Sequence, residues 1–315
     1  MKINTLGIVL SFYRKKEKLP LEKVCDGLCS AATLERIEKG ERKADSLLGS
    51  LLLERIGREV TQFELLLNDE DYALWDMRGQ IRKAMRRKDY TLMRQYLEMY
   101  RSMQKEYGEL HEQFCLYYEV RMAVELKKED CDKICHLALE ALKLTKVNID
   151  AKEITEKRLY TQTEIKLMLI LIHYGYMNNV ENAENTLLSL LAYIEYFYTE
   201  RRREEIGIAI ITELIELERK CKDDVMTVFY IDKGIALLSQ GRGVKGLEKL
   251  HFLKAQILTD KYHNDSIQIT EKQEIQRECL MAYCICEIMG YSEMMQEIEQ
   301  FGKEKLSWQI TELEM

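Results

Sequence analysis

Apolar residues recur at three- and four-residue spacing along almost the whole chain, and no stretch alternates apolar and polar residues as a half-buried strand does. Beyond residue 68, breaker residues interrupt this pattern at intervals of about one helix. Paired, the intervals give helical hairpins of roughly 40 residues, somewhat longer than the ~34 of a tetratricopeptide repeat. The interruptions fall near residues 88–89, 108, 128–130, 148–150, 178–179, 199, 222–224, 241–243, 262–265 and 290–292.

The pattern therefore predicts an all-α protein. Each hairpin has one apolar face that only its neighbours can cover, so we expect a right-handed superhelix of tetratricopeptide-like hairpins with a concave inner surface. This repeat domain would span residues 68–315 and a smaller domain residues 1–67. Trp75 is expected to pack inside the first hairpin, as a large aromatic at helical spacing usually does.

Residues 19–43 of the smaller domain have the layout of a helix-turn-helix. Pro20, the only proline, stands where a helix can begin, because its φ is already helical and its missing N–H would be unsatisfied there. Leu21, Val24 and Leu28 continue at helical spacing, and residues 27–30 supply a tight turn.

The second helix of this motif has its own start and stop signals. Ser30 is a good N-cap, Leu34 and Ile37 are spaced to face the first helix, and Gly40 suits the left-handed position that ends a helix. In a helix-turn-helix the start of the second helix enters the major groove. An ordinary small helical subdomain with a solvated charged face is the alternative.

The candidate DNA-binding residues lie on and around this second helix. Some fall on its outer face, and the cations before and after it are placed to reach phosphates. The set is Arg14, Ala31, Ala32, Thr33, Glu35, Arg36, Lys39, Arg42 and Lys43.

Residues 3–67 resemble the Cro/repressor-like domain of Rgg, PlcR and NprR-type peptide-responsive regulators of Gram-positive bacteria. The matching residues are Gly27, Leu28, Cys29, Ser30, Thr33, Leu34, Glu35, Arg36, Ile37, Glu38, Lys39, Gly40, Arg42 and Lys43. The chain departs from that pattern at three positions: Leu21 replaces a usual glutamine, Ala32 a usual serine and Ala44 a usual proline. The resemblance implies a transcription regulator that binds double-stranded DNA and carries tetratricopeptide-like repeats. We expect a homodimer, because one short recognition helix rarely supplies enough affinity and two-fold proteins read palindromic half-sites.

Charge and composition fit this interpretation. Residues 1–62 hold twelve Lys or Arg and nine Asp or Glu, a net charge of +3, so the rest of the chain carries −10. A mildly basic end can release counterions from DNA while an acidic remainder is held away from it. One proline and 15 glycines among 315 residues leave few helix breakers.

The repeat region is rich in tyrosine, whose flat ring and hydroxyl suit a groove that grips an extended peptide. The resemblance implies that this ligand is a short signalling peptide. The candidate peptide-binding residues are Tyr117, Arg121, Tyr160, Tyr174 and Asn178; the alternative is that the tyrosines fill space between helices. The runs 86–88 and 201–203 are interpreted as cations that solvate helix ends, and the second run could instead clamp a peptide carboxylate.

The sequence predicts neither an enzyme nor a cofactor. It has no glycine-rich phosphate loop and no catalytic histidine motif. The nine cysteines are expected to be buried thiols without a metal, since no second pair matches Cys131 and Cys135. No apolar run is long enough to span a membrane, so we expect a cytoplasmic protein. The rival to a regulator is a repeat adaptor with a degenerate helix-turn-helix; operator, peptide and direction of regulation stay open.

Overall fold

The computed structural model describes residues 5–58, 69–103, 108–126, 130–147, 158–176, 179–198, 200–240, 246–262 and 269–308. These residues form fifteen helices and no strand, which confirms the all-α prediction. The chain divides into two compact units, Met1–Thr199 and Glu200–Met315. Within the described residues, no helix is both long and apolar enough to cross a membrane.

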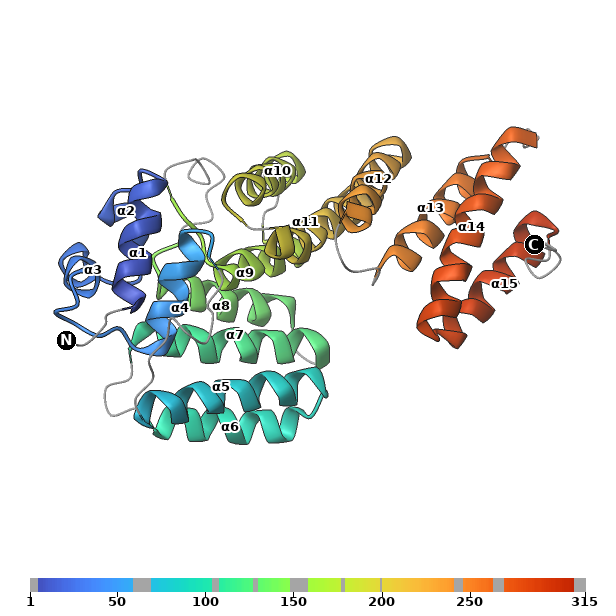
Figure 1. The fold of residues 1–315 in the computed structure, drawn as a ribbon. Helices are drawn as coiled ribbons and strands as arrows, with labels where there is room; N and C mark the ends of the chain where they lie inside the picture. Colours follow the sequence, from blue (N-terminus) through green and yellow to red (C-terminus); the bar gives the residue numbers. More distant parts are fainter. Residues whose placement is uncertain are drawn as a thin grey trace. The chain divides into compact units, whose positions relative to one another are not determined.

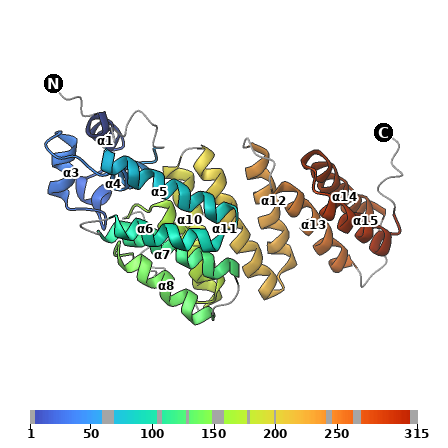
Figure 2. The same cartoon turned by 90° about the horizontal axis from the view of Figure 1, so that it is seen from below.

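The first four helices form a group at one end of the first unit, here called the head (Figures 1 and 2). Their bounds are α1 Thr5–Lys16, α2 Leu21–Cys25, α3 Ala31–Glu38 and α4 Ser46–Arg55. The helix-turn-helix is α2 and α3, as predicted, with Pro20 in the N-cap position of α2. Leu34 and Ile37 are buried in the head core, where their spacing placed them.

The rest of the first unit, here called the body, consists of α5 Asp69–Arg86, α6 Tyr90–Ser102, α7 Glu109–Leu126, α8 Cys131–Lys143, α9 Gln162–His173 and α10 Val180–Phe197. The helices α5 and α6 pack against each other, as do α7 and α8, and α8 also packs on α9. Trp75 contradicts its prediction: it is 37% exposed on α5, beside the ring of Tyr72 at 5.8 Å between centroids.

The second unit contains α11 Glu200–Cys221, α12 Asp224–Gln240, α13 Leu247–Tyr262, α14 Ile269–Met289 and α15 Ser292–Leu306. Consecutive helices pack in pairs, α11 on α12, α13 on α14 and α14 on α15. One cluster of its core joins α13, α14 and α15 through Phe252, Ala255, Leu258, Ile275, Cys279, Ala282, Cys286, Ile298 and Leu306.

Candidate nucleic-acid interface

Local sequence sets both ends of the candidate recognition helix α3. The Ser30 hydroxyl accepts the Thr33 backbone N–H at 3.1 Å, which satisfies one of the free donors at the helix start. At the other end Gly40 adopts φ 76°, a left-handed conformation that costs glycine little. These two residues fix the length of α3 and therefore which side chains can face DNA.

The outer face of α3 is open to solvent. Ala32, Glu35 and Arg36 are exposed. The Lys39 ammonium lies 2.7 Å from a Glu35 carboxylate oxygen, and Arg42 Nη1 donates to the Thr33 hydroxyl at 3.3 Å. The carboxylate raises the pKa of Lys39 through their hydrogen bond, so the cation stays charged. Lys39 can bind a phosphate only if its ion pair with Glu35 opens or rotates.

Arg14 does not belong to this face. Its guanidinium binds both carboxylate oxygens of Glu38, at 2.6 and 2.8 Å, and also donates to the Leu19 carbonyl oxygen. The side chain is only 14% exposed. Arg14 therefore ties α1 to the end of α3, and its prediction as a phosphate contact is corrected to a structural role.

The back of the head is joined to the body through the buried guanidinium of Arg55. Arg55 Nη2 lies 3.1 Å from a carboxylate oxygen of Glu164 on α9, and both side chains are fully buried. Its Nη1 donates to the carbonyl oxygens of Val24 and Asp26, at the end of α2. Arg55 thus links α4, the helix-turn-helix and the body in one contact.

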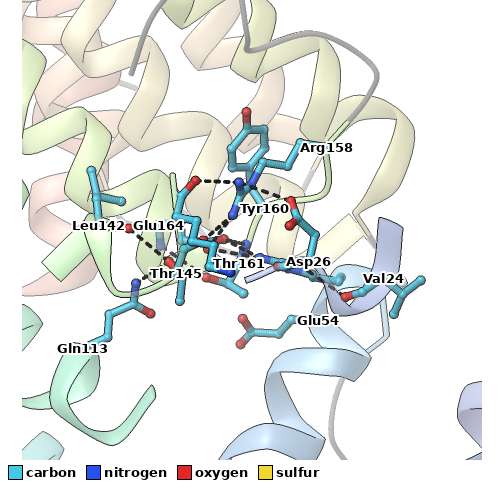
Figure 3. A network of polar contacts seen from close by, with 12 residues as sticks. Val24, Asp26, Glu54, Gln113, Leu142, Thr145, Arg158, Tyr160, Thr161 and Glu164 are labelled. Atoms are coloured by element: carbon cyan, nitrogen blue, oxygen red, sulfur yellow. Dashed lines mark hydrogen bonds and ion pairs between the residues drawn. The ribbon is translucent and has the colours of Figure 1, made fainter. Parts of the chain in front are cut away.

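Arg158 strengthens the same contact from the body side. Its Nη1 lies 3.2 Å from the Asp26 carboxylate and donates to the Lys146 carbonyl at 2.8 Å. Gly27 sits at φ 70°, and a Cβ there would collide with the Thr145 carbonyl oxygen, so the turn between α2 and α3 lies directly against the body. The contact network appears in Figure 3, where Arg158 stands between Glu164 and Asp26.

A second junction joins α4 to the first hairpin. Arg78 of α5 donates to the Ser46 hydroxyl at 2.5 Å and to the Tyr100 oxygen at 3.0 Å. Tyr100 lies 2.6 Å from Nδ1 of His111, whose Nε2 faces Asp45 at 3.7 Å. Burial lowers the pKa of His111, which favours the neutral ring; in the tautomer that carries its proton on Nε2, Nδ1 accepts the Tyr100 hydroxyl.

The predicted peptide-binding residues are not gathered on one open surface. Tyr160 is 1% exposed: its backbone N–H donates to the Tyr193 hydroxyl, and its carbonyl oxygen accepts the hydroxyls of Tyr193 and Tyr198. It packs the body and cannot touch a ligand, which corrects its prediction. Tyr174 caps the opposite end of the 12-residue helix α9, about 18 Å away at the ~1.5 Å rise per residue of an α-helix.

Tyr117 and Arg121 lie one turn apart on α7. Tyr117 is 7% exposed, whereas the Arg121 side chain is 38% exposed and its guanidinium carbon lies 5.9 Å from the Tyr117 ring centroid. Asn178 lies outside the described residues. Arg121 is thus the accessible member of this pair.

Sequence reasoning missed Arg55, Glu164 and Arg158. A lone arginine after a run of leucines, and the Thr161-x-x-Glu164 capping box, were the available signals. Neither signal predicts which side chain Arg55 contacts, because Arg55 and Glu164 are 109 residues apart in the sequence.

The structure of Bacillus thuringiensis PlcR in complex with the peptide PapR7 and DNA covers 94% of this chain and 99% of its own, at a TM-score of 0.55 and 14% identity. The chain has the fold of PlcR. Streptococcus dysgalactiae SHP pheromone receptor Rgg2 aligns over 95% of the chain, with a TM-score of 0.41 and 13% identity. ComR from S. thermophilus, in complex with DNA and its signalling peptide ComS, aligns over 96%, with a TM-score of 0.34 and 15% identity; each alignment covers 99% of the known chain. No family model and no curated protein sequence matches the chain.

The fold shared with PlcR extends over both units, so the likeness is not confined to the helix-turn-helix.

Proposed function

We propose that this protein is a transcription regulator that binds double-stranded DNA through α3 and senses a short signalling peptide through its helical repeats. The observation that carries the proposal is the head itself. The helix α3 and the residues just after it present the exposed side chains of Arg36, Lys39 and Arg42. The opposite side of the head is anchored to the body by Arg55 of α4. The PlcR structure, which contains both a peptide and DNA, supports the same reading at the level of the fold.

The division of labour proposed from the sequence is kept: residues 1–67 bind DNA and residues 68–315 bind the effector and dimerise. Two copies of one short recognition helix are needed for operator affinity, because two-fold proteins read paired half-sites. The α14–α15 region is the proposed dimer surface. Met281 is 45% exposed there, whereas Met294 and Met295 pack against the core of the second unit.

The rival function is a protein-binding adaptor whose helix-turn-helix no longer binds DNA. One observation favours it. Lys39 forms an ion pair with Glu35, and Arg36 lies 4.0 Å from Glu41, so two cations of the proposed DNA-binding face have carboxylate neighbours. An adaptor would have no need to release these cations. The two functions differ in whether the purified chain binds DNA at all.

A gel shift on the DNA upstream of the protein's own gene separates them. A regulator should shift this DNA, and replacing Arg36 and Lys39 together by alanine should abolish the shift while the thermal midpoint hardly changes, since both side chains are exposed. Arg42→Ala should weaken binding to all sequences alike and lower the salt slope by about one unit. An undiminished shift in the double variant rejects α3 as the reading helix.

The control pair for this experiment is Lys133→Ala with Lys143→Ala on α8, which removes the same charge from exposed positions outside the head and outside the proposed dimer surface. It should shift the operator like the native chain. Absence of any shift by the native chain, on its own upstream DNA and on sequences selected from random duplexes, favours the adaptor.

A further inference from the structure

The end of α5 carries an unusual density of positive charge. Residues 82–89 hold five cations and one carboxylate, in a chain whose net charge is −7. All five cations are exposed, and no ion pair joins any of them to a carboxylate within the described part of the chain. We call this group, Arg82, Lys83, Arg86, Arg87 and Lys88, the basic surface.

Arg82 faces the neighbouring helix α7. Its guanidinium carbon lies 5.7 Å from the ring centroid of Phe114, and the rings of Phe114 and Tyr118 are 4.9 Å apart. Arg121 approaches the same aromatic group over Tyr117, whose ring lies 5.2 Å from that of Tyr118. Burial raises the pKa of Tyr118, and the charges of Arg82 and Arg121 both oppose that rise, as expected when both guanidinium groups lie near its hydroxyl.

Stabilisation of the α5 end does not account for this arrangement. Cations favour the last turn of a helix, where carbonyl groups are unpaired. Arg82 lies a full turn before Arg86, the last residue of α5, and its side chain is directed to α7. Arg121 is also loosely paired, since its Nη2 lies 3.8 Å from Glu125, which accepts the Tyr90 hydroxyl at 3.0 Å.

We propose that Arg82 and Arg121 bind a carboxylate of the effector peptide and that the other cations of the basic surface steer the peptide to them. Two planar guanidinium groups can each present paired N–H donors to a carboxylate. The aromatic rings of Phe114, Tyr117 and Tyr118 form an apolar support beneath them. This inference rests on the proposed peptide sensing and names the chemical group that the peptide must carry.

DNA phosphate is the competing anion, and the position of the basic surface argues against it. The helix α5 runs away from the head, so its basic end lies at the far end of the first hairpin from α3 (Figures 1 and 2). Recognition by α3 places the duplex against the head. The basic surface is therefore remote from the bound duplex.

Two labelled peptides test the proposal and distinguish the source of the carboxylate. One is an amidated peptide of eight glutamates, whose carboxylates are all on side chains; the other is a peptide of eight glutamines with a free C-terminus. In fluorescence anisotropy at low salt, the native full-length chain should bind at least one of them. Replacing Arg82 and Arg121 by glutamine should weaken that binding about tenfold or more, as expected for loss of two charge-assisted contacts.

The matched control is Arg36→Gln with Lys39→Gln, which removes the same charge from the head and should change peptide affinity less than about twofold. Equal binding by native chain and Arg82/Arg121 variant, or loss only in the head variant, overturns the proposal. So does a native chain that binds neither peptide, or a variant that loses duplex affinity and salt slope while peptide binding is unchanged. Arg82→Gln alone, at an exposed position, serves if the double variant melts early and should still weaken binding.

The peptide measurement contains no DNA, and the operator gel shift contains no peptide. If the chain does not shift DNA, the proposed DNA binding is wrong, but the proposal that Arg82 and Arg121 bind a carboxylate is not affected. If the peptides bind at Arg82 and Arg121 but no peptide from culture supernatant alters operator affinity, peptide sensing fails while the carboxylate site stands.

Discussion

Arg55 and Arg78 are both buried where the head meets the body, but their surroundings differ. Arg55 pairs with the buried carboxylate of Glu164, whereas Arg78 is held by the hydroxyls of Ser46 and Tyr100. Removing one member of a buried ion pair leaves an uncompensated charge, and removing a cation from neutral partners leaves only weakened hydrogen bonds. The two junctions should therefore respond differently to the loss of their arginine.

Both junctions also bear on how the head is positioned on the body. Both junctions contact the helices behind α3 and leave its outer face exposed. The head and α5–α10 belong to one compact unit. We therefore expect the junctions to set the position of α3 without covering it.

The largest effect is expected at the first junction. Arg55→Leu should lower the free energy of unfolding by about 3–5 kcal/mol, because Glu164 stays buried and keeps only the more distant cation of Arg158, 3.9 Å away. Urea denaturation followed by circular dichroism measures the loss. Replacing Arg55 and Glu164 together by leucine should restore part of it, and a double variant that is no more stable than the single one contradicts the charge argument.

A smaller loss is expected at the second junction. Arg78→Met should cost about 1.5–3 kcal/mol, the range for hydrogen bonds to a charged group, because no carboxylate is left behind. Tyr100→Phe should cost less, since Arg78 keeps Ser46. The same denaturation experiment ranks the variants. If Arg78→Met proves more damaging than Arg55→Leu, the carboxylate does not explain the difference between the junctions.

The second junction contains His111, and lowering the pH should weaken this junction through that histidine. Burial holds the pKa of His111 below its ordinary value. Near pH 6.5 the unfolded chain therefore binds a proton at this residue that the folded chain does not bind. Stability from this group is full above that pH and falls as the pH drops towards the folded pKa; Asp45 and Arg78 are the charges that face the ring. His111→Gln should flatten the pH dependence of the melting temperature between pH 7 and 5, and an unchanged slope would place its source elsewhere.

The smallest change is expected on the open face of α3. Arg36→Gln with Lys39→Gln should leave the free energy of unfolding almost unchanged, because exposed ion pairs contribute little. The same proteins should fail to shift operator DNA. A loss of stability comparable with that of Arg78→Met would show that these side chains support the fold.

Local signals in the sequence were enough to place the helix-turn-helix. Pro20, Ser30 and Gly40 mark helix ends through backbone preferences that act within a few residues. In the structure Ser30 caps α3 and Gly40 follows it, while Pro20 stands one residue before the first helical residue of α2. Apolar spacing likewise assigned Leu34 and Ile37 to the core. Candidate contacts on α3 could be named from the sequence because a helix of known start has a known outer face.

Side-chain roles that depend on distant partners were not predictable. Arg14 looked like a phosphate contact until Glu38 was found beside it, and Tyr160 looked like a ligand contact until it was found buried. Trp75 was expected inside the first hairpin but is exposed, because helical spacing does not say whether a neighbouring helix covers that face. The sequence by itself determined the helices, their ends and the presence of a helix-turn-helix, since these follow from short-range backbone and hydrophobic preferences. Only the tertiary structure decided that Arg55 meets Glu164 and that Arg82 and Arg121 share one aromatic support, because packing between helices far apart in the chain brings these groups together.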